Sequence, residues 1–382
     1  MKGYVDRFDS LIAGWVYDPA HPNKAIDVVI ECAGHELHRC CASIYRNDLI
    51  PVIGSGEHGF GFEPVSIPGF DRNMRIQIFA LADKKHLLYE GDWVYEGVVA
   101  EGVDGWLFLN RDTNEVNRRI AGEIGVDSEE IYRTAVQMAS REALLSRMEI
   151  PYLALIVPEK NVVCSKYYPG LKVSECRAVS LILKELQKLN SKISYPLPDF
   201  LSSSIDLYYR TDTHTNANGY KVIYKILQQE LPEFFGQIEL PTPNFNGEFC
   251  GDLGSKLNPR RTEETEEYNH PHTSDHFYKH DKIQQTIQQG EKLRGQVVHI
   301  INRNASRRLL IFGTSSAYHS LPIVSCAFAE TIFVWENTFD FRIIEVYKPD
   351  CILWFPSERF LPMQVDDAKG LPETLKLIRD LM

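Results

Sequence analysis

Two short segments of the chain carry the side chains of a nucleophilic site. Asp212-Thr213-His214 supplies a base and a carboxylate that can orient it. Gly313-Thr314-Ser315-Ser316, about a hundred residues later, supplies a hydroxyl. A serine activated by a histidine–aspartate pair attacks acyl carbonyls. The sequence therefore favours the hypothesis of acyl transfer or ester cleavage.

The spacing of Asp212 and His214 suits a base and its orienting group. Residues two apart in an extended loop project to the same side. The carboxylate can then accept from one ring nitrogen while the other nitrogen takes the serine proton. The alternative is an Asx-turn before a helix, with a solvated histidine. That helix is indicated by an apolar stripe that follows Asn216 or Asn218, either of which could cap it.

The serine follows a predicted strand over residues 309–312 through Gly313. Ligands of open parallel sheets bind outside the carboxyl ends of the strands. The helix expected after the serine offers backbone N–H groups to a developing oxyanion. A Gly-Thr-Ser-Ser turn is also an ordinary helix cap, and taken alone it does not separate the two interpretations.

The sequence pattern around these residues predicts an α/β domain that holds them. Strongly apolar strands alternate with helices late in the chain, which is typical of a parallel sheet covered on both faces. We predict a domain over residues 98–382 with a polar insertion at about 240–295. Its expected strands cover residues 152–158, 308–312, 331–335 and 351–355, and its expected helices cover residues 127–148, 174–189, 318–328 and 341–347.

Residues 1–97 have a different pattern. Short runs rich in β-branched and aromatic residues alternate with turn signals such as Asp18-Pro19 and Ala33-Gly34. This pattern predicts a small all-β sandwich-like domain before the α/β domain.

Four segments together resemble the SGNH-hydrolase-like domain of the alginate O-acetyltransferases, a family of polysaccharide O-acetylation. They are Val103-Asp104-Gly105-Trp106-Leu107-Phe108, residues 150–160, Tyr209-Arg210-Thr211-Asp212-Thr213-His214 and Gly313-Thr314-Ser315. The resemblance implies Ser315 as nucleophile, His214 as base and Asp212 as its orienting carboxylate. It selects Ser315 over Ser316 because Ser315 occupies the serine of the family's Gly-(Asp/Thr)-Ser triplet.

Residues near this predicted triad are candidates for binding substrate. Relatives commonly carry an aromatic residue directly after the histidine, where this chain has Thr215, so sugar stacking or local shape is expected to differ. Asp252 belongs to a lesser matching block, Gly251-Asp252-Leu253. We take Tyr209, Arg210, Thr215, Asp252 and Tyr318 as candidate substrate-binding residues.

The N-terminal segment resembles a β-rich accessory module that occurs in bacterial glycan-synthesis proteins, often beside glycosyltransferases. The resemblance is carried by Gly3-Tyr4-Val5-Asp6, residues 12–19, Arg46-Asn47-Asp48-Leu49 and Gly59-Phe60-Gly61-Phe62. It does not settle a function for the module. We expect Trp15, Phe60 and Phe62 to be core residues rather than a platform for sugars.

Composition and charge exclude some classes of partner. The formal net charge is −11 and no long basic block occurs, so we expect no nucleic-acid partner. No apolar run is long enough for a membrane span. The charged start, Met1 to Asp9, is unlike a signal peptide, and eight cysteines without regular spacing indicate reduced thiols. We therefore expect a cytoplasmic protein, although relatives are often periplasmic.

Two other clusters invite interpretation. His270, His272, His276 and His280 invite a metal hypothesis, but Pro271 and Thr273-Ser274 favour a polar loop, so no metal site is predicted. The acidic run at residues 263–267 is interpreted as a solvated face.

The sequence thus predicts a serine-dependent acyltransferase that O-acetylates a bacterial polysaccharide or its precursor, without a cofactor and with an unknown acetyl donor. Its expected partners are the acyl donor, a glycan or sugar acceptor and, by resemblance, other polysaccharide-biosynthesis proteins. Two alternatives stay open: a carbohydrate O-acetyl esterase with the same residues, and a non-catalytic glycan-binding or scaffold protein.

Overall fold

The computed structural model describes all residues except 9–10, 65–66, 68–69, 71–73, 94–97, 111, 113, 237–238, 258, 269–295 and 362–365. The chain forms two compact units, Met1–Ala100 and Glu101–Met382. Among the described residues, no helix combines the length and apolar character needed to cross a bilayer.

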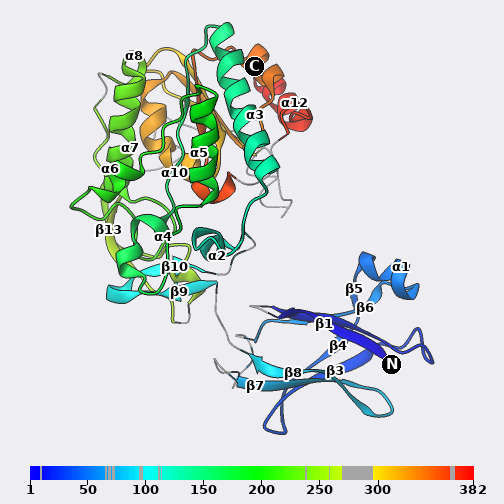
Figure 1. Ribbon diagram of the computed structural model, residues 1–382. Coiled ribbons are helices and arrows are strands. Elements are labelled where there is room, and N and C mark those ends of the chain that lie inside the picture. The colour runs from blue at the N-terminus through cyan, green and yellow to red at the C-terminus, as the bar shows by residue number, and fades with distance from the viewer. Residues whose placement is uncertain are drawn as a thin grey trace. The chain divides into compact units, whose positions relative to one another are not determined.

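The first unit is built from two antiparallel four-stranded sheets (Figure 1). One sheet has the order β1 (Lys2–Phe8), β2 (Ile12–Tyr17), β6 (Glu57–Phe62), β5 (Ile44–Tyr45). The other has the order β4 (His35–Ala42), β3 (Ile26–Cys32), β7 (Met74–Leu81), β8 (Lys85–Trp93), and a short helix α1 covers Ile50–Ile53.

Alternate residues of both sheets meet in one apolar core, which gives the predicted sandwich. Phe60 and Phe62 belong to this core, whereas Trp15 is half-buried. The expectation of a core role therefore holds for the two phenylalanines.

A five-stranded sheet forms the centre of the second unit. Its order is β11 (Tyr152–Ala154), β17 (Cys351–Phe355), β15 (Arg308–Gly313), β16 (Glu330–Trp335), β14 (Gln296–Ile301). The first four strands are parallel, as predicted, but β14 runs antiparallel to β16. The edge strand was not predicted, because it follows directly on a long polar stretch.

Helices cover both faces of this sheet (Figure 1). Leu310, Phe312 and the alternate residues of neighbouring strands pack against α3 (Ser128–Arg147), α5 (Ala178–Lys188), α11 (Phe341–Tyr347) and α12 (Pro372–Leu381). Helix α10 (Ser315–Val324) contacts β15 and β16, and α7 (Ala217–Glu230) contacts α10.

Short elements complete the fold. They are β9 (Val99–Glu101), β10 (Leu107–Leu109), α2 (Val116–Ile120), α4 (Lys160–Val163), α6 (Leu197–Leu201), α8 (Pro232–Phe235) and the antiparallel pair β12 (Asn244–Phe249) and β13 (Glu263–Glu267). The pair β12–β13 lies inside the predicted insertion.

Candidate active site

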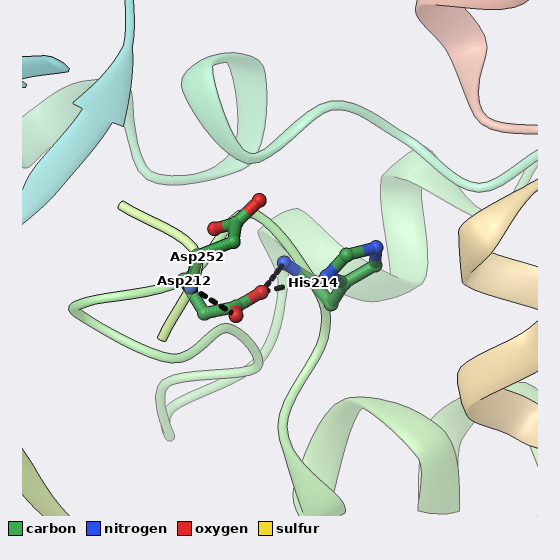
Figure 2. A group of neighbouring side chains, drawn as sticks. All are labelled: Asp212, His214 and Asp252. Carbon is green, nitrogen blue, oxygen red and sulfur yellow. Dashed lines mark hydrogen bonds and ion pairs between the residues drawn. The ribbon is translucent and has the colours of Figure 1, made fainter. Parts of the chain in front are cut away.

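The Asp212–His214 pair lies in the buried loop between α6 and α7. Oδ1 of Asp212 accepts a hydrogen bond from Nδ1 of His214 at 2.6 Å and a second from the His214 backbone N–H at 2.8 Å. Both side chains are buried. Figure 2 shows the imidazole on the side of Asp212 that faces away from Asp252. The spacing of two residues therefore produces the contact expected from it.

The electrostatics of Asp212 fix the proton on the imidazole. Burial opposes ionisation of Asp212, but hydrogen bonds from His214 and from the backbone N–H of Asp252 outweigh burial and hold the pKa of Asp212 below its ordinary value. An ionised carboxylate only accepts hydrogen bonds, so Nδ1 must carry a proton. In the neutral ring Nε2 then keeps its lone pair, which is the form a general base needs.

The segment around Asp252 supports the same loop. The Asp252 backbone N–H donates to Oδ2 of Asp212 at 2.7 Å, and the Asp252 carboxylate accepts from the backbone N–H and hydroxyl of Thr213 at 2.8 and 2.7 Å. Gly251 makes this approach possible, since a Cβ there would lie 2.3 Å from the carbonyl oxygen of Thr211.

Lys160 lies beneath the loop with 1% of its surface exposed. Its ammonium donates to the carbonyl oxygens of Leu107 at 2.6 Å and of Arg210 and Asp212 at 2.9 Å. Burial lowers the pKa of Lys160 from 10.5 to about 8. All three ammonium protons are used, so this side chain ties β10 to the segment that carries Asp212.

Glu263 corrects the interpretation of the acidic run as a solvated face. The run forms β13, in which Glu263, Thr265 and Glu267 are half-buried and alternate with exposed residues. The Glu263 carboxylate accepts from the backbone N–H groups of Arg210 and Thr211 at 3.0 and 2.6 Å. The period of two of a strand turns one side of the run inward, where it holds the loop before Asp212.

The predicted nucleophile lies where β15 ends. Gly313 closes the strand, and Ser315 is the first residue of α10, three residues before the helix start expected from the sequence. A Cβ on Gly313 would lie 2.5 Å from the Phe355 carbonyl oxygen and 2.8 Å from Cβ of Ala317. Only glycine therefore permits this close passage from strand to helix.

The two neighbouring serines have different surroundings. Ser316 is buried, and its hydroxyl hydrogen-bonds the Ser357 hydroxyl at 2.7 Å, while the Thr314 hydroxyl lies 3.1 Å from the same oxygen. Ser315 is half-buried. The first N–H groups of a helix have no partner within it, and Thr314 provides no side-chain cap. The half-buried hydroxyl of Ser315 thus lies beside backbone N–H groups that can donate hydrogen bonds to an oxyanion.

His214 packs against α10, the helix that begins at Ser315. His319 packs against His214 in a tilted arrangement, with ring centroids 4.2 Å apart and planes at 40°. Ser315 and His319 are four residues apart in the helix and therefore share a face. His214 Nε2 is buried without a hydrogen-bond partner, so no hydrogen bond joins it to Ser315. Catalytic hydrogen bonds often close only when substrate is bound.

The candidate substrate-binding residues have different positions. Thr215 is 1% exposed and lies beside the Tyr220 hydroxyl, whereas Tyr209 is buried and stacks on Phe249 at 4.5 Å. Arg210 is exposed and Asp252 is half-buried. Tyr318 is half-buried on α10 and stacks on Trp335 at 5.2 Å. Arg210, Asp252 and Tyr318 thus keep access to solvent, and Thr215 and Tyr209 shape the loop from within.

A polar cavity of about 710 Å³ lies beside this loop. Its lining includes neither His214 nor Ser315. It is lined by Asp104, Gly105, Asp206, Tyr208, Arg210, Thr211, Asn216, Asn218, Arg261, Thr262, Glu263, Glu264 and Thr265. Of the candidate substrate-binding residues, Arg210 lines this cavity.

Asp212, His214 and Asp252 also bring three side chains of metal-ligand type together. Ligand-type atoms of the three lie within 4.8 Å of one another. The His214 atom that faces the carboxylates is the protonated Nδ1, however, which offers no lone pair, and both carboxylates accept N–H donors. The geometry fits orientation of a base rather than metal ligation. His270, His272, His276 and His280 lie outside the described residues.

Three residues that support the candidate site were not predicted from the sequence. Lys160 stands in a matching block, but a single lysine gives no sign that it is buried against carbonyl groups. Glu263 was obscured by its acidic neighbours. His319 carried a signal that could have found it, since it lies four residues after Ser315 on a predicted helix.

A family model described as "SGNH hydrolase-like domain, acetyltransferase AlgX" matches residues 99–293. No curated protein matches the chain. Bacillus cereus PatB1 is similar in structure, with 16% identity, a TM-score of 0.51 and coverage of 69% of this chain and 97% of that one. At this identity the likeness shows a shared fold.

Two further solved structures are similar over much of the chain. The O-acetyltransferase domain of Pseudomonas putida AlgJ has 15% identity and a TM-score of 0.45, with 74% of this chain and 99% of that one covered. Pseudomonas aeruginosa AlgX has 12% identity and a TM-score of 0.44, with 74% and 66% covered.

Proposed function

Because this chain belongs to the AlgX family of SGNH hydrolase-like acetyltransferases, we propose that it O-acetylates a glycan through an acyl intermediate on Ser315. The observation that carries the proposal is the buried Asp212–His214 pair, held against the helix that begins with Ser315. The acceptor is a bacterial polysaccharide or its sugar precursor, and the donor is an activated acetyl ester or thioester.

In the first half-reaction Nε2 of His214 removes the Ser315 hydroxyl proton while the serine oxygen attacks the acetyl carbonyl. Backbone N–H groups at the start of α10 stabilise the negative charge on the carbonyl oxygen. The imidazolium then protonates the departing group of the donor. Asp212 stabilises the imidazolium and keeps Nδ1 protonated throughout.

In the second half-reaction a sugar hydroxyl takes the place of the donor. Nε2 removes its proton, its oxygen attacks the acetyl–serine carbonyl, and the bond to Ser315 Oγ breaks. The proton then returns to Ser315. If water attacks instead, the product is acetate and the enzyme acts as an esterase, so acceptor-dependent product formation separates the two activities.

A serine-reactive fluorophosphonate tests the nucleophile. We expect an adduct on the Ser315 peptide of the wild-type protein, none in Ser315→Ala, and an adduct at the wild-type position in Ser316→Ala. The Ser316 variant is a matched control, because it removes the adjacent hydroxyl that is bonded to Ser357. A wild-type protein without an adduct would favour a non-catalytic glycan-binding protein.

A further inference from the structure

The nitrogen with which the proposed base would act is buried. Nε2 of His214 is buried and has no hydrogen-bond partner. A buried polar atom without a partner is unfavourable, so structures keep one mainly where function requires it. This nitrogen must meet a hydroxyl during the proposed reaction, so whatever covers it decides which hydroxyl arrives.

His319 packs against the ring that carries this nitrogen. The His319 ring lies tilted against the His214 ring at 4.2 Å between centroids, and Tyr318 meets the His319 ring edge-on at 5.6 Å. The His319 side chain is otherwise exposed to solvent. An exposed ring thus packs directly against a buried one.

The surroundings of His319 favour a neutral ring. Packing against His214 and Tyr318 removes part of the water around the ring, and this loss together with the neighbouring His214 lowers the pKa of His319 from its ordinary value. Because the side chain is exposed, solvent screens part of this effect. A neutral ring can stack on the base without charge repulsion when His214 becomes an imidazolium.

We propose that His319 is a specificity-determining residue, which restricts access of water to His214 Nε2 and so favours acetyl transfer over hydrolysis. This role rests on the proposed function. A ligand can displace a side chain only if it binds the displaced conformation more tightly than the original one. A sugar brings many contacts that can displace an exposed ring, whereas a single water molecule brings few.

Two reactions of the full-length protein test this role. p-Nitrophenyl acetate without an acceptor gives a burst for acylation of Ser315 and a steady rate for hydrolysis of the acetyl-serine. For His319→Ala we expect acylation still to give a burst, and the steady rate to rise at least about tenfold relative to the rate of the burst, a modest share of what general-base help contributes. His319→Phe, which keeps a flat ring, should hydrolyse at the wild-type rate.

Diethyl pyrocarbonate measures access to His214 directly, because it modifies neutral imidazoles and mass spectrometry assigns the peptide. We expect faster modification of His214 in His319→Ala and in His319→Gln than in the wild type or His319→Phe. Circular dichroism verifies that each variant is folded, and the glutamine variant replaces the alanine variant if the latter is not.

The outcomes are distinguishable. The role of His319 would be overturned if His319→Ala and His319→Gln left both the steady rate and the modification of His214 unchanged. A burst from Ser315 in the same experiment would still support the proposed function. Absence of both a burst and a Ser315 adduct in the wild type would overturn the proposed function and the role that rests on it.

Discussion

At the scale of single residues, the hydrogen bond between Asp212 and His214 makes the sharpest prediction. In Asp212→Asn the amide can donate to Nδ1, so the proton moves to Nε2 and the base is lost. We expect kcat for acetyl transfer to fall on the order of 10³–10⁴-fold. Steady-state kinetics measure the loss.

Asp252→Asn is the matched control for that variant. Asp252 contacts Thr213 through its carboxylate, and its backbone N–H rather than its side chain contacts Asp212. The fall in kcat should therefore be much smaller. Equal losses in the two variants would contradict an orienting role specific to Asp212.

Lys160 makes a prediction about stability and pH. Its pKa is about 8 in the folded protein and 10.5 ordinarily. Between these values the unfolded chain binds more protons, so this group makes the free energy of unfolding rise with pH, by about 3 kcal/mol over the whole interval. Denaturant titrations from pH 7.5 to 10.5 should show this rise in the wild type relative to Lys160→Met.

Lys160→Met should also be less stable than the wild type at pH 7.5, because three carbonyl groups lose their donor. The removal of one buried partner typically costs about 1–3 kcal/mol. A difference between the two proteins that does not change with pH would show that Lys160 keeps its ordinary titration in the fold.

Which residues could be predicted depended on local pattern. Asp212, His214 and Ser315 stand in short motifs, and the turn and loop expected around them are present. His319, Lys160 and Glu263 gain their roles from segments far away in the sequence. Their partners are brought near only by the assembled sheet and loop. No local pattern marks Lys160 or Glu263, and His319 is marked only by its spacing of four residues from Ser315.

At the scale of elements, the turn from β15 to α10 depends on Gly313. Gly313→Ala places a methyl group against the Phe355 carbonyl and Ala317, so strand or helix must shift. Overpacking of this kind costs about 1–3 kcal/mol, and we expect a lower thermal midpoint and slower fluorophosphonate labelling. Gly125→Ala, which meets no atom within 4 Å, should change neither.

The start of α7 gives a second prediction at this scale. The Asn216 side chain accepts from the N–H groups of Asn218 and Gly219 and donates to the carbonyls of Asp206 and Tyr208. Asn216→Ala should cost about 1–2 kcal/mol. It should also slow acetylation, because the same side chain holds the loop that carries His214.

Asp127→Ala is the control for the α7 cap. It removes one N-cap hydrogen bond of 3.3 Å from α3, a helix that bears no site residue. It should lower the thermal midpoint slightly without changing acetylation. Normal acetylation activity in Asn216→Ala would contradict the role of the α7 cap in holding the loop that carries His214.

Sequence patterns predicted most elements around the site. Apolar runs located β15, β16, β17 and α11, and the helical period located α3. The edge strand β14 was missed because its neighbours in sequence are polar, and the start of α10 was placed late because the serines are poor helix signals. Propensity and period thus identify buried elements better than edges and ends.

At the scale of the whole molecule, the unit Glu101–Met382 contains the entire candidate site and a core of its own. We expect residues 101–382 produced alone to fold and to label with fluorophosphonate at the rate of the full chain. Circular dichroism and labelling kinetics test this. A folded fragment that fails to label would show that residues 1–100 contribute to acylation.

The carboxylates that steady the base also set the electrical environment of the acceptor. Asp212, Asp252 and Glu263 surround one loop of a chain whose formal net charge is −11. Charges act over roughly 30 Å at 0.01 M salt but only about 10 Å at 0.1 M. A polyuronate would therefore be repelled in dilute buffer, and added sodium chloride would raise the rate of its acetylation. The rate of acetylation of a neutral glucan would not change with salt. Ionic strength thus becomes a simple means of sorting acidic from neutral acceptors.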